Sequence, residues 1–489
     1  MINTECRNLA KRSFTKIGII LMFLISVAPA LNAQTFSTLA DFDGKANGAS
    51  PAWEILAQGI DGNLYGTTHL GGVDLDLGSI FKVTPSGTLT SLYSFTSLFA
   101  GNPYGGLVLA TDGNFYGTTA AQLGGTVYQM TPGGVVTPIF YFCTPPYTGG
   151  TQCADGQLPA DTLVLGINGN LYGMTPEGGA NNNGGTVFEV TREGRLTTLY
   201  SFCAQPNCAD GMYPIVALVL GNDGNFYGTT NYGGANGNNG TIFKITPAGQ
   251  LTTLHSFSSS DGSIPAGTLI QATDGYFYGV TNEGGAQGDG TIFKISADGA
   301  FQTLYNFCAQ ANCTDGAYPS GGLVQATDGN FYGTTANGGA SGSYGTVFQL
   351  TPNGTLTTLH AFDNSDGSDP EGSMLQATNG ILYGTTYYGG PVCTDFPNGC
   401  GTLFSVSMGL APFVKSVTAA GRVGAGVGIL GNDLTGATQV TFNGTAAQFT
   451  VQSPTLILTH VPAGATTGTI QVTLPGGTLS SNAPFHVIP

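Results

Sequence analysis

The stretch Asp223-Gly-Asn-Phe-Tyr-Gly-Thr-Thr230 recurs in this chain, slightly varied, seven times. Each copy begins with Asp or Asn, and successive copies lie 51 to 56 residues apart. A fixed period of this size indicates a repeat architecture. The tyrosines of the seven copies are Tyr65, Tyr116, Tyr172, Tyr227, Tyr278, Tyr332 and Tyr383.

One repeat contains the sequence signals of four short strands. Asp223-Gly-Asn225 and Thr246-Pro-Ala-Gly249 are turn sequences, because Asp-Gly suits a tight hairpin and Pro suits the second turn position. The apolar or β-branched segments around them predict strands at residues 217–220, 226–230, 240–245 and 251–257. Each repeat is therefore predicted to form one antiparallel sheet.

The adjacent aromatic residues Phe226 and Tyr227 must point to opposite faces of that sheet. Both faces then need to be covered. The blades of a β-propeller cover each other in this way, whereas a two-sheet sandwich leaves one face of each sheet polar. The sequence therefore predicts an all-β, seven-bladed β-propeller over residues 34–406. A β-solenoid, which normally has shorter repeats, is the minor alternative.

The last repeat lacks a fourth strand. The isolated N-terminal segment Phe36-Ser-Thr-Leu-Ala-Asp-Phe42 matches the fourth strand Leu356-Thr-Thr-Leu-His-Ala-Phe362. We expect this N-terminal strand to complete the seventh blade, because closure removes an exposed sheet edge. Pairing of residues 36–42 within the first blade would contradict this expectation.

Composition agrees with a turn-rich β protein. The chain has 489 residues with 78 glycines, 8% charged residues and 10% aromatic residues. The aromatic content and the regular apolar runs argue against disorder, although the charged fraction is unusually low. The length suits a repeat domain followed by one small module.

Residues 1–33 resemble a secretory signal peptide. A basic segment with Arg7, Lys11, Arg12 and Lys16 precedes an apolar run at residues 17–27 that is short for a membrane span. Its removal would change the net charge from −16 to −19. An exported protein is predicted, and its acidic surface disfavours nucleic acid and anionic lipid as partners.

Eight cysteines follow the predicted signal peptide. No Cys-x-x-Cys motif or nearby histidine favours a metal site, whereas close spacing favours local disulfides in an exported protein. The predicted pairs are Cys143–Cys153, Cys203–Cys208, Cys308–Cys313 and Cys393–Cys400.

The repeat period ends after residue 406. Residues 407–411 are a predicted linker, and alternating strand and turn signals over residues 412–489 predict a small immunoglobulin-like β-sandwich. The segment ILGNDLTGATQVTFNG resembles the IPT/TIG family. The resemblance implies a spacer, adhesion or domain-pairing module. DNA binding, known for some members, is not carried over because Lys415 and Arg422 are the only basic residues here.

The repeats themselves resemble the GloVer tandem repeat of exported bacterial proteins. The likeness rests on DGNFYGTT followed by GTIFKITPAGQLTTLHSF and extends over residues 36–406. It implies export and often display at the bacterial cell surface, and it implies no enzyme activity.

The sequence offers no convergent catalytic motif. Nucleophile-elbow, HExxH and Walker-type motifs do not occur. His255 and His360 occupy a fourth-strand position that holds Tyr200 or Tyr305 in other repeats, which favours a structural role. One Asp per hairpin turn is far from the six to eight oxygens that calcium takes. No metal and no cofactor are predicted.

A second series, Asp-Gly-x-x-Pro, lies between repeats. With the disulfides it predicts a rigid rim that is either a set of well-made turns or a binding surface. Exposed tyrosines there suit sugars or protein surfaces. The candidate binding residues are Asp155, Asp210, Asp261, Asp315, Asp366, Tyr213, Tyr318 and Tyr388.

Three functions remain open. The main prediction is a monomeric, non-enzymatic binding or adhesion protein that presents this rim to a glycan or surface protein. The alternatives are a propeller enzyme that acts on an extracellular polysaccharide or peptide, and a purely structural envelope component. An enzyme would require carboxylate or histidine side chains that break the repeat symmetry and converge at the channel.

Overall fold

The computed structural model describes residues 34–51, 55–73, 76–97, 100–121, 124–143, 153–393 and 396–488. The predicted signal peptide, 1–33, lies outside these residues. The described chain is all-β apart from two short 3-10 turns, η1 (Pro206–Cys208) and η2 (Ala311–Cys313). No helix within these ranges has the length and apolar character needed to cross a membrane.

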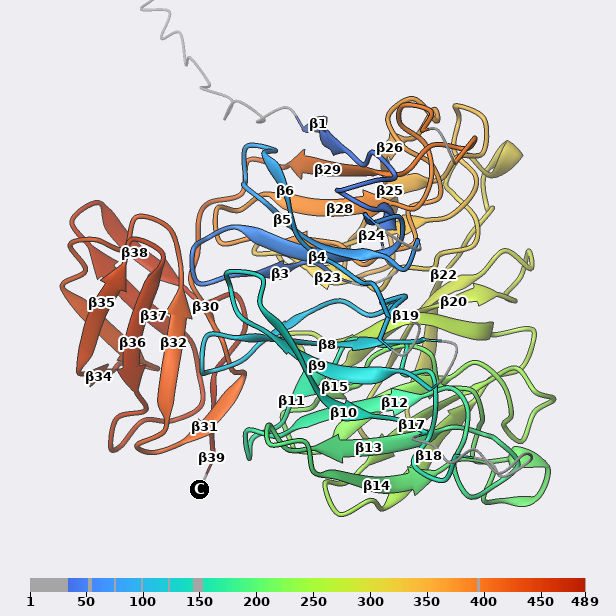
Figure 1. The fold of residues 1–489 in the computed structure, drawn as a ribbon, viewed down its shortest axis with the longest axis horizontal. Helices are drawn as coiled ribbons and strands as arrows, with labels where there is room; N and C mark the ends of the chain where they lie inside the picture. The colour runs from blue at the N-terminus through green and yellow to red at the C-terminus, as the bar shows by residue number, and fades with distance from the viewer. Residues whose placement is uncertain are drawn as a thin grey trace, which may run out of the picture. The chain divides into compact units, whose positions relative to one another are not determined.

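Seven antiparallel sheets each contain one copy of the repeat, and we call them repeat sheets 1 to 7 (Figure 1). Sheet 1 contains β2 (Ala49–Pro51), β3 (Ala57–Gln58), β4 (Leu64–Leu70), β5 (Ser79–Val83) and β6 (Leu89–Ser94). Sheet 2 contains β7 (Val108–Leu109), β8 (Phe115–Thr119), β9 (Thr126–Met130) and β10 (Val136–Tyr141). Sheet 3 contains β11 (Val164–Leu165), β12 (Leu171–Thr175), β13 (Thr186–Val190) and β14 (Leu196–Ser201).

The next three sheets repeat this order. Sheet 4 contains β15 (Val219–Leu220), β16 (Phe226–Thr230), β17 (Thr241–Ile245) and β18 (Leu251–Ser256). Sheet 5 contains β19 (Ser263–Gln271), β20 (Phe277–Glu283), β21 (Thr291–Ile295) and β22 (Phe301–Asn306). Sheet 6 contains β23 (Val324–Gln325), β24 (Phe331–Thr335), β25 (Thr346–Leu350) and β26 (Leu356–Ala361).

Sheet 7 is built from both ends of the repeat region. It contains β27 (Leu375–Gln376), β28 (Leu382–Thr386), β29 (Thr402–Ser407) and the N-terminal β1 (Thr35–Asp41). β1 pairs antiparallel with β29, with Phe36 opposite Val406, and the two strands lie side by side in Figure 1. The expected pairing of the N-terminal strand with the last repeat is therefore confirmed.

Aromatic rings pack each repeat sheet against the next. Tyr227 and the preceding Phe226 lie on opposite faces of β16, and both are fully buried. Tyr227 stacks on Phe277 of sheet 5 at 3.9 Å between ring centroids, and Tyr172 of sheet 3 stacks on Phe226 at 4.2 Å. Tyr383 of sheet 7 shares a core with Leu64 of sheet 1. The packing therefore runs through all repeats and returns to the first.

The hairpin turn of each repeat holds the tyrosine in place. Asp223 Oδ1 accepts the Asn225 backbone N–H at 3.1 Å, while Asp223 Oδ2 accepts the Tyr227 hydroxyl at 2.8 Å. Where Asn replaces Asp, as at Asn379, its amide nitrogen donates to the Tyr383 hydroxyl at 2.8 Å. These contacts support the structural interpretation of the turn carboxylates, because each one serves its own hairpin.

A glycine before the third strand lets adjacent sheets approach closely. Gly240 has φ of 94°, and a Cβ there would lie 2.3 Å from the Thr230 carbonyl oxygen and 2.7 Å from Pro265 of sheet 5. The same contact joins Gly401 of sheet 7 to Pro51 of sheet 1. Glycine is required here because both the backbone angle and the space exclude a side chain.

The C-terminal segment forms its own small β structure. One sheet contains β30 (Lys415–Ser416), β32 (Gly426–Leu430), β36 (Leu456–His460) and β35 (Phe449–Ser453). A second contains β34 (Thr445–Ala447), β33 (Gln439–Phe442), β37 (Ile470–Leu474) and β38 (Gly477–Ser480), while β31 (Ala420–Arg422) pairs with β39 (His486–Ile488). Ile429 and Ile457 from the first sheet share one buried core with Val440 and Val472 from the second.

Phe36→Ala tests the contribution of β1 to stability. The Phe36 ring stacks on His360 at 3.6 Å and contacts Phe362 and Phe404. Because these contacts join sheet 7 to sheet 6, we expect a loss of about 2 kcal/mol of unfolding free energy in urea. Ser37→Ala, on the exposed face of the same strand, is the control. Equal stability of the two variants would contradict a closing role for β1.

Candidate functional site

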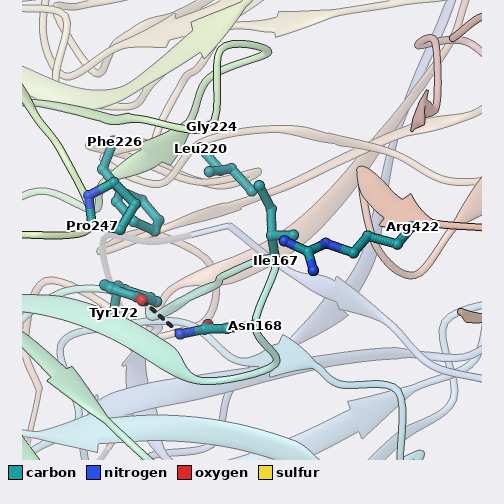
Figure 2. A pocket seen from close by; sticks show the side chains of 8 residues that line it. All are labelled: Ile167, Asn168, Tyr172, Leu220, Gly224, Phe226, Pro247 and Arg422. Carbon is teal, nitrogen blue, oxygen red and sulfur yellow. Dashed lines mark hydrogen bonds between the residues drawn. The ribbon is translucent and has the colours of Figure 1, made fainter. Parts of the chain in front are cut away.

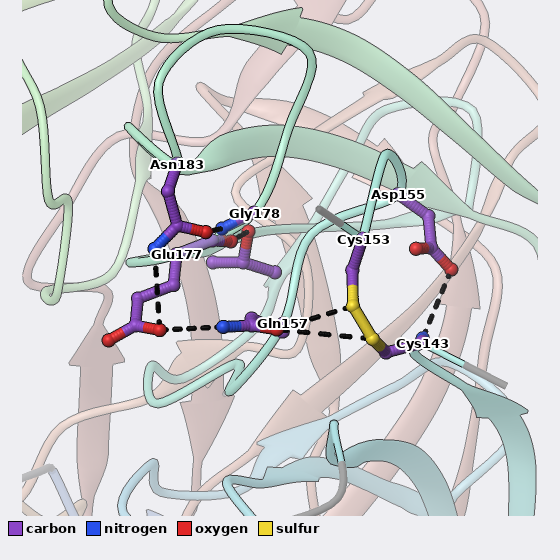
Figure 3. The surroundings of a disulfide bond; sticks show 8 residues. Cys143, Cys153, Asp155, Gln157, Glu177, Gly178 and Asn183 are labelled. Carbon is purple, nitrogen blue, oxygen red and sulfur yellow. Dashed lines mark hydrogen bonds between the residues drawn. A yellow bond between two sulfur atoms is a disulfide. The ribbon is translucent and has the colours of Figure 1, made fainter. Parts of the chain in front are cut away.

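Three of the four disulfides lie in loops that follow the fourth strands of repeat sheets, and the fourth lies between the second and third strands of sheet 7. All four predicted pairs are present: Cys143–Cys153, Cys203–Cys208, Cys308–Cys313 and Cys393–Cys400. Figure 3 shows Cys143–Cys153 with Gln157 beside it, whose amide nitrogen donates to Glu177 at 2.6 Å. Asp289 lies near Cys308 and Cys313, but sulfurs joined in a disulfide cannot act as thiolate metal ligands.

The aspartates of the Asp-Gly-x-x-Pro series are turned into their own loops. Asp210 is fully buried and accepts the Tyr200 hydroxyl at 2.8 Å and the backbone N–H groups of Ala204 and Gln205. Asp315 repeats this set with Tyr305, Ala309 and Gln310. These carboxylates therefore join the fourth strand to the loop that follows it.

The other three members of the series make related contacts. Asp261 and Asp366 contact the imidazoles of His255 and His360 at 3.1 and 2.7 Å, at the position that Tyr200 and Tyr305 occupy in repeats 3 and 5. Asp155 accepts the Cys143 backbone N–H at 3.4 Å. The geometry gives the series a structural role and explains why His and Tyr exchange at one position, since each donates to the same carboxylate.

A different residue of the same loops is unusual. In all seven repeats the residue before the loop proline has a left-handed backbone, with φ between 52° and 61°. Its N–H donates to a carbonyl of the preceding sheet, as Tyr213 does to Gly184 at 2.9 Å. Left-handed bulky residues are strained, and such strain gathers at functional sites. The seven residues are Ser50, Asn102, Leu158, Tyr213, Ile264, Tyr318 and Asp369.

These seven positions break the repeat symmetry. A Pro directly follows each of them and a Gly stands two residues before six of them, whereas the residue itself is polar in repeats 7, 1 and 2 and apolar or aromatic in repeats 3 to 6. Five of them precede the first strand of their sheet, and Ser50 and Ile264 lie in β2 and at the start of β19, so all seven gather at the disulfide-bearing end of the repeats. We call this end, with the seven residues around it, the strained ring.

Acidic and tyrosine side chains converge at the polar part of the strained ring. Burial raises the pKa of Tyr388, and the nearby charges of Asp369 and Glu371 raise it further. Burial also raises the pKa of Tyr387 to about 12, and Tyr388, Glu371 and Tyr104 add to the shift. Residues from repeats 7 and 2 are therefore within electrostatic reach of one another.

Tyr104 extends this cluster across the ring. Its pKa is raised by burial and by Tyr213, which belongs to repeat 4. The His69 ring lies against Tyr104 in a tilted arrangement at 3.9 Å between ring centroids, and burial lowers the pKa of this histidine to about 4. His69 is therefore neutral at pH 7 and adds no positive charge to the cluster.

The pKa of Asp369 is raised to about 6 by burial. Its carboxyl group therefore exists in both protonated and ionised forms near neutral pH. Glu371 follows two residues later, beyond Pro370. Both carboxyl groups are close enough to Tyr388 to raise its pKa. A carboxyl group with a raised pKa and a second carboxyl group in the same cluster are compatible with acid–base catalysis.

The three tyrosines predicted as binding residues lie at different places on the strained ring. Tyr213 and Tyr388 belong to the cluster just described. Tyr318 lies elsewhere, near Asp289, whose charge raises its pKa. All three are partly buried. The sequence-based choice did not include Asp369, Glu371 or Tyr104, although the variable residue before each loop proline was a usable signal for Asp369.

Repeat sheets that pack face to face, with the seventh packed against the first, define a β-propeller-like protein. The chain belongs to the Gloeobacter/Verrucomicrobia repeat family, whose model matches residues 26–152, 147–273 and 238–451. This match bears out the GloVer resemblance. No match supports the IPT/TIG resemblance, and the third repeat match extends into the C-terminal segment.

Solved structures with a similar fold include several described as enzymes. A gluconolactonase from Xanthomonas campestris is 12% identical, with 77% of this chain and 99% of that chain covered and a TM-score of 0.39. A suggested 6-phosphogluconolactonase from Bacteroides uniformis is 17% identical, with 65% and 85% covered and a TM-score of 0.41. A suggested glucose dehydrogenase from Thermus thermophilus is 13% identical, with 76% and 100% covered and a TM-score of 0.41. No curated protein sequence matches the chain.

The main functional prediction is corrected by this comparison. A non-enzymatic binding or adhesion protein was the first interpretation, and the similar structures, which are described as gluconolactonases and related enzymes, do not support it. Likeness at such low identity concerns the fold, and it transfers no activity or substrate to this chain. Any reaction must therefore be argued from the residues of the strained ring.

Asp210→Ala tests the structural role of the aspartate series. The variant leaves two loop N–H groups and the Tyr200 hydroxyl without their buried acceptor. We expect a loss of about 2–3 kcal/mol of unfolding free energy in chemical denaturation. Asp298→Ala, in an exposed turn, should change the denaturation midpoint little. A near-neutral Asp210→Ala would show that this carboxylate does not hold the loop.

Asp369→Asn tests the raised pKa through stability. The folded pKa of about 6 exceeds the ordinary value of 3.8, so folding favours the protonated form. The associated stability is complete below pH 3.8 and is lost as pH rises through 6. Above pH 6.5 we expect Asp369→Asn to be more stable than the parent by about 1–2 kcal/mol, and this gain should vanish near pH 4. Thermal unfolding of both proteins between pH 4 and pH 7 measures this difference in stability. A stability gain that does not change with pH would contradict the raised pKa of Asp369.

Proposed function

We propose that the protein is an exported enzyme that hydrolyses glycosidic bonds in an extracellular polysaccharide at the strained ring. The proposed architecture is a seven-bladed β-propeller, closed by β1, with a C-terminal immunoglobulin-like sandwich. Seven repeat sheets with continuous packing from the seventh to the first support the propeller. Two sheets around one core support the sandwich. Four local disulfides support export.

The pair Asp369 and Glu371 carries this proposal. Glycoside hydrolysis needs one carboxylic acid that is protonated near neutral pH and one carboxylate. Asp369, with its pKa raised to about 6 by burial, suits the acid. It would give its proton to the leaving glycosidic oxygen, while Glu371 would take a proton from the attacking water. The sum is the addition of one water molecule across the bond.

Tyrosine rings around the two carboxyl groups favour a sugar substrate. Tyr104, Tyr387 and Tyr388 offer flat apolar faces with polar tips, which suit the faces and hydroxyl groups of pyranose rings. A net charge of −16 and the acidic cluster disfavour polyanionic substrates. Tyr213, which is close enough to Tyr104 to raise its pKa, would extend the contact to a neighbouring sugar. We therefore propose a neutral polysaccharide.

The test uses the purified chain from residue 34 onward with a panel of neutral polysaccharides. Release of reducing ends should occur with at least one of them and should fall at least 100-fold in Asp369→Asn and in Glu371→Gln. Asp298→Asn, in an exposed turn, is the matched control. Because the reaction needs protonated Asp369, kcat should fall as pH rises through about 6.

Three results would overturn the proposal. Folded protein that releases no reducing ends from any neutral polysaccharide would favour a structural envelope component. Full activity in both carboxyl variants would place the chemistry elsewhere. A rate that rises with pH through 6 would exclude Asp369 as the acid.

A further inference from the structure

Each repeat sheet has a first strand that ends away from the strained ring, and the last residue of this strand differs between repeats. In four repeats the last residue of the first strand is a glutamine that reaches the preceding sheet, as Gln325 does when it accepts the Thr273 N–H at 2.9 Å. In the other three repeats this residue is leucine. The glutamines are Gln58, Gln271, Gln325 and Gln376, and the leucines are Leu109, Leu165 and Leu220.

The C-terminal segment covers one part of this leucine-lined arc. Leu430 and Leu456 share a buried core with Leu109, and Ile60 packs against it. The Thr455 hydroxyl donates to the Ile60 carbonyl oxygen at 2.6 Å. This part of the arc is therefore occupied by the chain itself.

The rest of the arc opens into a crevice of about 430 Å³. Ile167 and Leu220 line it together with Tyr172, Phe226 and Pro247, as Figure 2 shows. Ile167 is 40% exposed, although its counterpart Ile60 is packed against a core. The volume falls in the range of small-molecule sites.

One cation faces this apolar crevice. Arg422, at the end of β31, extends to Ile167 in Figure 2. Within the described ranges its guanidinium makes no hydrogen bond or ion pair. Asn168 is engaged elsewhere, because its amide donates to the Tyr172 hydroxyl at 3.0 Å and to Glu189 at 2.9 Å. Arg422 is therefore available to a ligand.

We propose that this crevice binds a small molecule with an apolar, ring-sized body and one carboxylate. The body would lie against Ile167 and Leu220, and the carboxylate would receive two parallel N–H donors from Arg422. The chain has 28 acidic and 12 basic residues, so an arginine without an acidic partner is unusual in it. Because this arginine lies at an apolar crevice, it favours a ligand with an apolar body and one negative charge. The site is separate from the proposed hydrolytic site. Ile167 follows the first strand β11 at one end of sheet 3, whereas Leu158 of the strained ring precedes β11 at the other end.

The test measures binding of 1-naphthoate by calorimetry and compares it with the neutral isostere 1-naphthamide. We expect one molecule of 1-naphthoate per chain. Its affinity should be at least tenfold lower in Arg422→Gln and in Ile167→Asp, with unchanged melting temperatures. Arg195→Gln, at an exposed arginine outside the crevice, should bind like the parent. Naphthamide should bind more weakly to the parent and should not respond to Arg422→Gln.

Two results would overturn the proposal. One is no saturable binding of 1-naphthoate up to millimolar concentration. The other is equal affinity of Arg422→Gln and Arg195→Gln, which would mean that the anion is not held at the crevice. Neither result depends on hydrolytic activity, so the two proposed sites can fail separately.

Discussion

The repeat architecture depends on a tyrosine ring that stacks on the next sheet while its hydroxyl is held by its own hairpin turn. Tyr227 shows the arrangement: its ring lies 3.9 Å from Phe277, and its hydroxyl donates to Asp223 at 2.8 Å. The ring contributes the buried area that joins two sheets. The hydrogen bond satisfies a polar group that would otherwise be costly to bury. One eight-residue motif thus fixes a turn, a strand and an interface.

Two kinds of residue in the loops between sheets have different roles. The aspartates of these loops accept hydrogen bonds from backbone N–H groups and from the Tyr or His of the fourth strand. The residue before the proline is held in a strained conformation by a hydrogen bond to the preceding sheet. This hydrogen bond uses only the backbone N–H of the residue, so its side chain can vary. Chemistry can be placed there without weakening the repeat.

The local features were predictable because short-range rules govern them. Four disulfides between cysteines five to ten residues apart followed from spacing, and the pairing of β1 with β29 followed from the match of Phe36–Phe42 to a fourth strand. The functional class did not follow. The proposed pair Asp369 and Glu371 did not stand out either, because in the sequence they look like two more variable residues in a loop.

The sequence by itself determined the repeat, its strands and turns, and the closing strand, since each depends on residues within one period or on a copy of that period. The tertiary structure alone decided which side chains meet. Tyr104 and Tyr213 belong to different repeats and Arg422 to another segment, yet each faces residues far away in the chain. Burial raises the pKa of Asp369, and how deeply this loop residue is buried depends on tertiary packing that no local sequence pattern encodes.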